Sequence, residues 1–292
     1  PSTLLEAPTI AALSAVVADP SLQVEPLVRM RRDGDGPPLF IVHSIWGDVL
    51  GMREITAAMT SDVPVYGLRA RGVPADGAGE VSVEGMARDY VAVMRGAQPA
   101  GPYRVTGHSF GALIAFEIAR QLAAQGEMVE WLGLIDGELS TGCHPPARRW
   151  GHRLALPYHY LRAALRDPRG ALGTAARVVP GMLRRAALRL FPKAPLESRP
   201  AEWLEDVPAA DREQAAVYLE AADAYRPRPY AGPVTYFLPA VRRFHVFADP
   251  MPVWRRVARG GLTVERVPGP HVGMVRGESA RLIARRIDRD LG

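Results

Sequence analysis

The sequence is poor in the features that would tie it to an oxidising compartment, a membrane or a nucleic acid. Its 292 residues include one cysteine, Cys143, so no internal disulfide can form, and we expect a reducing, cytoplasmic location. No run of about 18 apolar residues is present, so we expect no membrane span. The N-terminus carries Glu6 and no basic region, so we expect no signal peptide. A net charge of +5 does not indicate a nucleic-acid partner.

Lysine is also nearly absent, because Lys193 is the only lysine among 36 basic residues. The positive charge is concentrated in residues 147–193, which hold ten arginines and Lys193 against one acid, Asp167. Two interpretations stay open: a surface that docks an acidic domain or a phosphate, or an arginine-rich, solvated helix face. Membrane association of this amphipathic segment is a third interpretation, but we expect no membrane partner.

Much of the chain alternates between short apolar runs and stretches with helical periodicity. We expect strands at residues 38–43, 64–70, 103–107, 131–136, 234–240 and 262–267. We expect helices at residues 48–59, 83–96, 112–126, 209–224, 252–259 and 277–290. This order predicts an α/β fold, with a mostly parallel sheet and helices on both faces.

Two stretches interrupt the alternation. Residues 24–38 are rich in charges and turn formers, so we expect a linker or surface loop there. Residues 140–205 contain helical pieces, so we expect a helical lid inserted into the sheet at about these residues. The breaks between the pieces fall at Pro157, Pro168, Pro180, Pro192 and Pro195.

The pentad GHSFG, residues 107–111, lies between an expected strand and an expected helix. A serine hydroxyl is a weak nucleophile until a histidine takes its proton and N–H groups hold the oxyanion. In a strand–turn–helix context, Gly-x-Ser-x-Gly is typical of the nucleophile elbow of α/β-hydrolases. It predicts Ser109 as the nucleophile in a strained turn, with Gly107 and Gly111 allowing strand and helix to approach closely.

The general base on this fold comes last in the order serine, acid, histidine. Of seven histidines, only His271 follows the last expected strand, in VPGPHVGMV. We expect the side chain of His108 to be directed away from the neighbouring nucleophile, and we expect His43, at a strand end, to be structural. The sequence therefore predicts His271 as the base.

The acid has two candidates. Asp249, in FADPMP, follows a later strand, which is the more usual position in α/β-hydrolases. Asp136, in LGLIDGE, comes directly after the strand that follows the Ser109 helix, where its position is well fixed. We favour Asp136, and its alternative interpretation is a turn aspartate.

The oxyanion hole needs two N–H donors. We expect one from Phe110, the residue after the nucleophile, and the other from Ile45 in the loop HSIWG. Trp46 is predicted either to wall the acyl site or to fill core.

These stretches together resemble the C-terminal thioesterase domains of non-ribosomal peptide synthetases. PLFIVHSIWGDVLGM resembles the opening strand and oxyanion loop, GHSFGALIAFEIARQLAAQG the elbow and its helix, and VERVPGPHVGMV the closing strand and histidine. GLIDGE carries the acid 27 residues after Ser109, which supports Asp136. The chain departs from the family at Pro270, where an acid or amide is frequent, and at Trp46, where glycine is frequent.

The resemblance also implies partners. LLEAPTIAALSAVV is similar to the last helix of a peptidyl carrier domain, so residues 1–25 are expected to be its remnant and linker, and residues 26–292 the thioesterase domain. The substrate would be a peptidyl or depsipeptidyl thioester on the phosphopantetheine arm of an upstream carrier domain. We expect no cofactor and no metal in this chain, and a monomer when the domain is excised.

The implied reaction is release of the chain through an acyl-serine, by hydrolysis or by ring closure. We favour a macrolactone. A depsipeptide synthetase of the valinomycin type, which joins chain units before ring closure, is the specific variant that we consider. Two rivals remain: a free-standing serine esterase or lipase acting on small oxoesters, and a non-catalytic module that binds acyl chains or partners.

Overall fold

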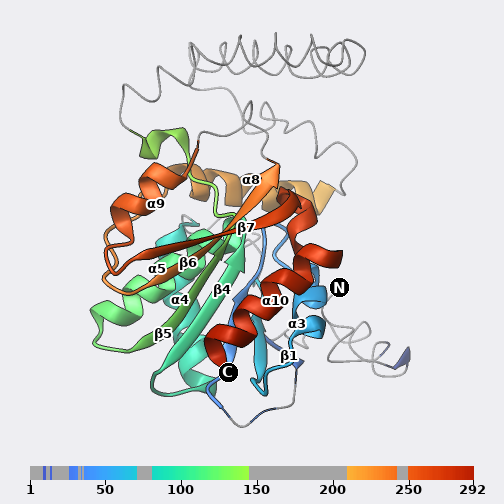
Figure 1. Cartoon of the computed structure of the whole chain (residues 1–292). Helices are drawn as coiled ribbons and strands as arrows, with labels where there is room; N and C mark the ends of the chain where they lie inside the picture. The colour runs from blue at the N-terminus through green and yellow to red at the C-terminus, as the bar shows by residue number, and fades with distance from the viewer. Residues whose placement is uncertain are drawn as a thin grey trace.

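The computed structural model describes residues 26–31, 34, 36–70, 81–144, 209–241 and 249–292, together with residues 9, 10 and 14. Its centre is a seven-stranded sheet in the order β1-β3-β2-β4-β5-β6-β7 (Figure 1). β1 (Leu27–Arg31) is antiparallel to β3 (Val65–Leu68), and the other neighbouring strands are parallel. These are β2 (Leu39–Val42), β4 (Tyr103–His108), β5 (Val129–Ile135), β6 (Val234–Val241) and β7 (Leu262–Pro270).

Helices follow most of the strands, and local signals set where they begin. They are α3 (Arg53–Ala58), α4 (Val83–Ala97), α5 (Phe110–Ala124), α8 (Ala209–Ala224), α9 (Met251–Val257) and α10 (Gly277–Leu291). The Ser82 hydroxyl accepts a hydrogen bond from the Gly85 N–H at 3.1 Å and caps α4. Asp48 Oδ1 accepts from the Leu50 N–H at 2.7 Å, at the start of the 3-10 turn Leu50–Met52 that leads into α3. None of the helices in these described ranges is long and apolar enough to cross a membrane.

The sheet separates two buried layers. Phe40 and Val42 of β2 belong to the larger core, together with side chains of α4, α5 and α9. Leu39 and Ile41, which point to the opposite face, pack in a second core with α3 and α10. Figure 1 shows these two helices side by side. Apolar side chains on both faces explain why β2 is a continuous hydrophobic run. The predicted α/β-hydrolase architecture is confirmed.

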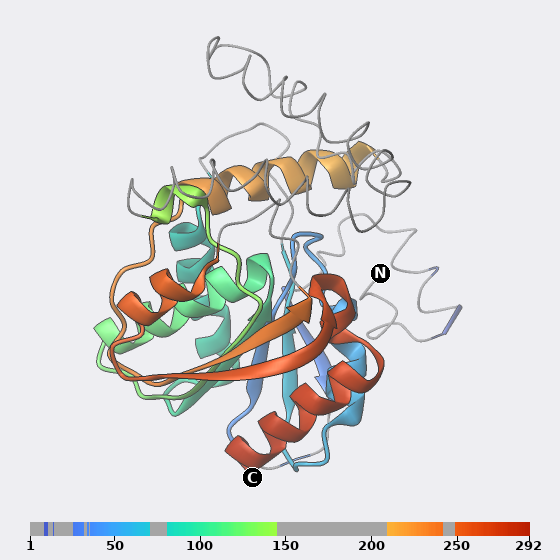
Figure 2. The same cartoon turned by 45° about the horizontal axis from the view of Figure 1, so that its top comes forward.

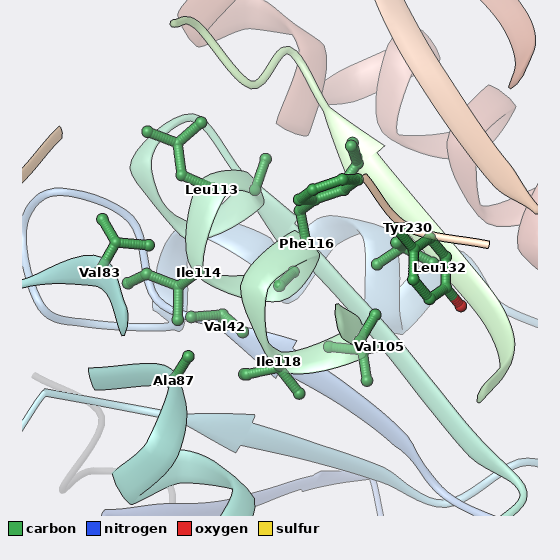
Figure 3. Close-up of a cluster of buried hydrophobic side chains, with 14 of the residues drawn as sticks. Val42, Val83, Ala87, Val105, Leu113, Ile114, Phe116, Ile118, Leu132 and Tyr230 are labelled. Atoms are coloured by element: carbon green, nitrogen blue, oxygen red, sulfur yellow. The ribbon is translucent and has the colours of Figure 1, made fainter. Parts of the chain in front are cut away.

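α5, the helix that follows the elbow, is buried on nearly all sides. Figure 3 shows its side chains among residues of the sheet and of α4: Leu113, Ile114, Phe116 and Ile118 lie near Val42, Val83, Ala87, Val105 and Leu132. Because this helix is held from every side, its N-terminus and the serine before it have a fixed place at the end of β4.

One prediction for the fold is wrong. Residues 24–38 were expected to form a loop, but Leu27–Arg31 form β1. The alternation of buried and exposed residues that indicates a strand covers few residues here: Val28 is buried and its neighbour Arg29 is exposed. β1 is an edge strand, so its arginines can stay at the surface, and Arg29 donates a hydrogen bond to the Tyr66 hydroxyl at 2.9 Å. Charged residues therefore concealed the alternation.

Most of the lid predicted at residues 140–205 lies outside the described residues, because residues 145–208 are not described; the same holds for most of the predicted N-terminal helix. The lid and the division at residue 25 stay predictions. Within the described part, the chain leaves β5 towards the 3-10 turn Thr141–Cys143 and returns in α8. Figures 1 and 2 show α8 lying across the end of the sheet towards which the parallel strands point.

Candidate active site

Ser109 is the single residue between β4 and α5, and its backbone is strained. Its φ of 59° and ψ of −119° lie where residues other than glycine are rarely found. Its N–H donates to the carbonyl oxygen of Ile135 at 2.9 Å, which anchors the turn to β5. The hydroxyl is thereby placed at the N-terminus of α5, where unpaired N–H groups and the helix dipole favour negative charge.

The two predicted elbow glycines lie at close backbone approaches. A Cβ at Gly107 would overlap the carbonyl group of Gly111, so strand and helix touch at this point. A Cβ at Gly111 would overlap the carbonyl oxygen of His43, which comes directly after β2. The second glycine therefore lets the elbow approach the loop after β2 as well as its own strand.

His271 faces both predicted partners. It follows β7 and begins the 3-10 turn His271–Val275. Its Nε2 lies 2.9 Å from Ser109 Oγ and its Nδ1 lies 2.7 Å from Asp136 Oδ2. A carboxylate can only accept, so Nδ1 carries the proton and Nε2 is left to accept the hydroxyl proton of Ser109. The geometry is that of a serine–histidine–acid triad.

Asp136 is 1% exposed and lies directly after β5. Its φ is 44°, its N–H donates to the Phe237 carbonyl oxygen at 3.0 Å, and its Oδ1 accepts from the Tyr236 hydroxyl at 3.4 Å. Asp249, the other candidate, is exposed and accepts from the Met251 N–H at the start of α9. The carboxylate that meets the imidazole is therefore that of Asp136.

Two aromatic residues hold the turn after Asp136, and the sequence did not single them out. Trp254 Nε1 donates to the Gly137 carbonyl oxygen at 2.9 Å. The Tyr236 hydroxyl, whose single proton is shared between this oxygen and Asp136 Oδ1, lies 3.2 Å from the Gly137 oxygen. Both side chains are fully buried. In the sequence they are ordinary core aromatics, and only the pairing of β5 with β6 brings Tyr236 to this turn.

The two predicted oxyanion segments lie at the same sheet edge. Phe110 is the first residue of α5, so its N–H has no partner within the helix. Ile45 and Trp46 are the central residues of a turn in which the Gly47 N–H donates to the Ser44 carbonyl oxygen at 3.0 Å. Gly47 has a φ of +71°. The use of the Ile45 and Phe110 N–H groups as oxyanion donors stays a prediction.

Trp46 is 41% exposed, which favours the pocket-wall interpretation over the core one. Val272, next to His271, is 64% exposed. Both large apolar side chains are adjacent in sequence to predicted site residues.

His43 is fully buried beneath the turn that carries Ile45. Its Nδ1 lies 2.6 Å from the Ser44 carbonyl oxygen and its Nε2 lies 2.7 Å from the Tyr90 hydroxyl. Burial lowers the pKa of His43 to about 4, so the ring is neutral near pH 7. The carbonyl can only accept, so Nδ1 donates to it and Nε2 accepts from Tyr90. The prediction that His43 is structural agrees with these contacts.

His108 was expected to be directed away from the nucleophile, and the structure places its ring against His271. The two ring centroids are 4.7 Å apart, and His108 Nε2 donates to the His271 carbonyl oxygen at 3.1 Å. Burial, and then the nearby charge of His271, lowers the pKa of His108 to about 3. A neutral ring therefore supports the backbone of the base without repelling its protonated form.

Oxygen or nitrogen atoms of Asp136, Glu138 and His271 lie within 4.8 Å of one another, a spacing that could in principle suit a cation. The hydrogen bond between Asp136 and His271 Nδ1 already uses one atom of each residue. The arrangement fits proton transfer better than metal ligation.

Comparisons with known proteins find similar sequences and similar folds. The sequence pattern of the family described as "Thioesterase domain" matches residues 37–291. The nonribosomal peptide synthetase atrA of Aspergillus terreus is 37% identical over 136 residues, which are 45% of this chain and 14% of the synthetase. The chain therefore spans a small part of the length of this curated relative.

Solved thioesterase domains have the same fold. A NocB thioesterase domain, solved as a covalent complex with a fluorophosphonate nocardicin G analog, matches with a TM-score of 0.58 at 24% identity, over 89% of this chain and 96% of that one. The Vlm2 thioesterase domain bound with a dodecadepsipeptide matches with a TM-score of 0.54 at 20% identity, over 91% of this chain and 98% of that one. At these identities the likeness shows the fold alone.

Proposed function

Because the chain belongs to the thioesterase domain family, we propose that it releases an acyl or peptidyl chain from a carrier domain of a nonribosomal peptide synthetase, through an acyl-serine intermediate. The observation that carries this proposal is the contact of His271 with both Ser109 Oγ, at 2.9 Å, and Asp136 Oδ2, at 2.7 Å.

The first half-reaction forms the acyl-enzyme. Ser109 Oγ attacks the thioester carbonyl carbon while its proton moves to His271 Nε2. Asp136 then stabilises the imidazolium and keeps its orientation. The carbonyl oxygen becomes an oxyanion, which the N–H groups of Phe110 and Ile45 would hold. The carbon–sulfur bond breaks, and the thiolate leaves as a thiol with the proton from His271.

The second half-reaction removes the chain from Ser109. His271 takes a proton from the attacking group and returns it to Ser109 Oγ when the ester bond breaks. If water attacks, the product is a linear acid; if a hydroxyl or amine of the bound chain attacks, the product is a ring. The same residues serve both outcomes, so the triad does not choose between them.

The substrate would arrive on the phosphopantetheine arm of an upstream carrier domain, which makes that domain the partner. The matched relatives are multidomain synthetases, and the chain spans only a small share of them, which supports this assignment. The thiol of this arm would hold the acyl chain as a thioester, and this chain would supply no cofactor of its own.

We favour ring closure to a macrolactone, and the depsipeptide variant of this proposal joins chain units before the ring closes. Ring closure needs water to be kept from the acyl-serine and a long chain to fold back on itself. The length of the predicted lid and the exposed apolar side chains of Trp46 and Val272 support a site for a large, apolar substrate. The Vlm2 neighbour was solved with a bound dodecadepsipeptide, which fits the depsipeptide hypothesis.

Two rival functions are tested by substrate choice. A serine esterase would cleave a small oxoester at least as well as the matched thioester. A binding module would cleave neither. We expect the thioester of an acyl-N-acetylcysteamine to be cleaved faster than its oxygen analogue, and Ser109→Ala to abolish both reactions.

Product analysis then separates hydrolysis from cyclisation. With a long hydroxyacyl thioester, mass spectrometry should find a product 18 Da lighter than the linear acid if a ring is formed, since a ring is the acid without one water. Linear acid alone, from the full-length chain on its own carrier, would contradict the macrolactone proposal and leave the thioesterase proposal standing.

A further inference from the structure

Three rings from separate parts of the chain meet behind the predicted oxyanion hole, and we call them the ring cluster: His43, Phe110 and Tyr218. Tyr218 of α8 stacks on Phe110, with centroids 5.2 Å apart and planes inclined by 13°. Tyr218 also lies 5.7 Å from the His43 ring, and His43 lies 6.2 Å from Phe110. All three side chains are at most 4% exposed.

Two members of the ring cluster belong to the segments with the predicted donors. Phe110 carries one N–H group itself. His43 fixes the other segment, because its Nδ1 donates to the carbonyl oxygen of Ser44, the residue before Ile45. The third member, Tyr218, comes from α8 and lies outside both donor segments.

α8 makes a second approach to the same loop. One turn before Tyr218, the side-chain amide of Gln214 fills the space above Gly47, so that an added Cβ at Gly47 would overlap it. Through Tyr218, the helix packs on Phe110 of the elbow and on His43, which precedes the turn Ser44–Gly47. Through Gln214, it packs on Gly47 at the other end of that turn. Figure 2 shows α8 crossing this end of the sheet.

We propose that Tyr218 is a positioning residue for the oxyanion hole: by packing on Phe110 and His43 at once, it fixes the distance between the two N–H donors. The inference rests on the proposed function, since it needs Ser109 to be the nucleophile. Donors must lie about 2.7–3.1 Å from the developing oxyanion, and loss of one donor costs about 100- to 1,000-fold in rate. A partial displacement of one donor should lower the reaction rate by about 10- to 100-fold.

A purely structural role for Tyr218 would also slow the enzyme if it lowered the folded fraction, so a matched control is needed. Tyr230 is 3% exposed and packs edge-on against Phe116, with centroids 5.9 Å apart (Figure 3), and its ring contact is with Phe116 rather than with the ring cluster. Tyr230→Leu removes a buried aromatic ring as Tyr218→Leu does. Tyr218→Phe keeps the stacked ring and removes the hydroxyl alone.

The test measures the rate at which an alkyl fluorophosphonate labels Ser109, with the unfolding midpoint of each variant beside it. In labelling, Oγ forms a bond to phosphorus and fluoride leaves, while the phosphoryl oxygen occupies the oxyanion hole. We expect Tyr218→Leu to label about 10- to 100-fold more slowly than the wild type, and Tyr218→Phe and Tyr230→Leu to label within threefold of it.

A double-mutant cycle keeps the inference falsifiable if Tyr218→Leu is less stable than its control. Phe110→Leu removes the other half of the stack but keeps the backbone N–H. If the stack positions the donor, the double variant should label no more than about threefold more slowly than the slower single variant, because both changes break one contact. Rate losses that multiply in the double variant would overturn the inference.

The outcomes separate the inference from the proposed function. Labelling of the wild type at Ser109 with equal rates for Tyr218→Leu and Tyr230→Leu would overturn the inference alone. No labelling of the wild type would overturn both. Slow labelling of Tyr218→Leu, with an unfolding midpoint like that of Tyr230→Leu, would support positioning over a merely structural role.

Discussion

Asp136→Asn is the substitution that tests the role of the acid in the triad most directly. Asparagine has the shape of aspartate and tolerates the positive φ of 44° at this position, so the backbone has no reason to move. It cannot, however, offset the positive charge that the His271 ring gains when it takes the Ser109 proton. The Asp136 side chain is 1% exposed and its Oδ2 lies 2.7 Å from His271 Nδ1. Water therefore cannot reach the imidazolium there to stabilise its charge in place of the carboxylate.

The expected loss follows from this geometry. The corresponding change in a serine-protease triad lowers kcat about 10,000-fold. Each factor of ten corresponds to about 1.4 kcal/mol, so the loss amounts to roughly 5 kcal/mol of transition-state stabilisation. The assay is single-turnover release of thiol from an acyl-N-acetylcysteamine thioester at saturating enzyme, which reports the acylation step alone.

Asp249→Asn is the matched control. Asp249 accepts the Met251 N–H, two residues on, before α9, and the side-chain oxygen of asparagine can accept the same hydrogen bond. We expect this variant to release thiol at the rate of the wild type. An Asp136→Asn rate within tenfold of the wild type, or an equal loss in Asp249→Asn, would refute the assignment of the acid.

Three further predictions concern stability, pH and metals. Gly111→Ala should lower the free energy of unfolding by about 2 kcal/mol in urea titrations, because its Cβ would overlap the carbonyl oxygen of His43. Gly96→Ala, in open space on α4, should instead raise it by about 0.5–1 kcal/mol, and equal effects would refute the argument. The pKa values of about 4 for His43 and about 3 for His108 lie below that of an unfolded histidine, so the unfolded chain takes up protons first. Stability should therefore fall as the pH drops from 6.5 to 5, by roughly 2 kcal/mol per histidine, and His108→Gln should lose about half of this dependence; a flat profile would contradict the burial of both rings. Dialysis against EDTA should leave thioester turnover unchanged, and a loss that zinc restores would show a metal requirement.

Much of the fold followed from patterns that act over a few residues. The strands at 38–43, 103–107 and 131–136 are apolar because both sheet faces are covered, and helices begin where Ser82 caps or Ser109 turns the chain. These causes are local, so periodicity and turn residues were sufficient. β1 was missed because its arginines lie on an exposed edge, where hydrophobic alternation is weak.

For the candidate site, the sequence predicts the triad residues but not the contacts that support them. The order of Ser109, Asp136 and His271 along the chain, each after a parallel strand, predicts their meeting at one sheet edge. The supporting contacts were not predictable in this way. That Tyr236 reaches Asp136 and that Tyr218 stacks on Phe110 depend on strand register and on the path of α8, which no short pattern encodes.

The central claim is that Ser109 accepts the chain from a carrier thioester. The most direct measurement is the intact mass of the protein after mixing with an acylated carrier domain, for the wild type and for Ser109→Ala. The account predicts a mass increase equal to the acyl group on the wild type, lost on Ser109→Ala, with free carrier thiol released in step. An adduct of the same mass on both proteins, or thiol release without passage through an acylated protein, would contradict it.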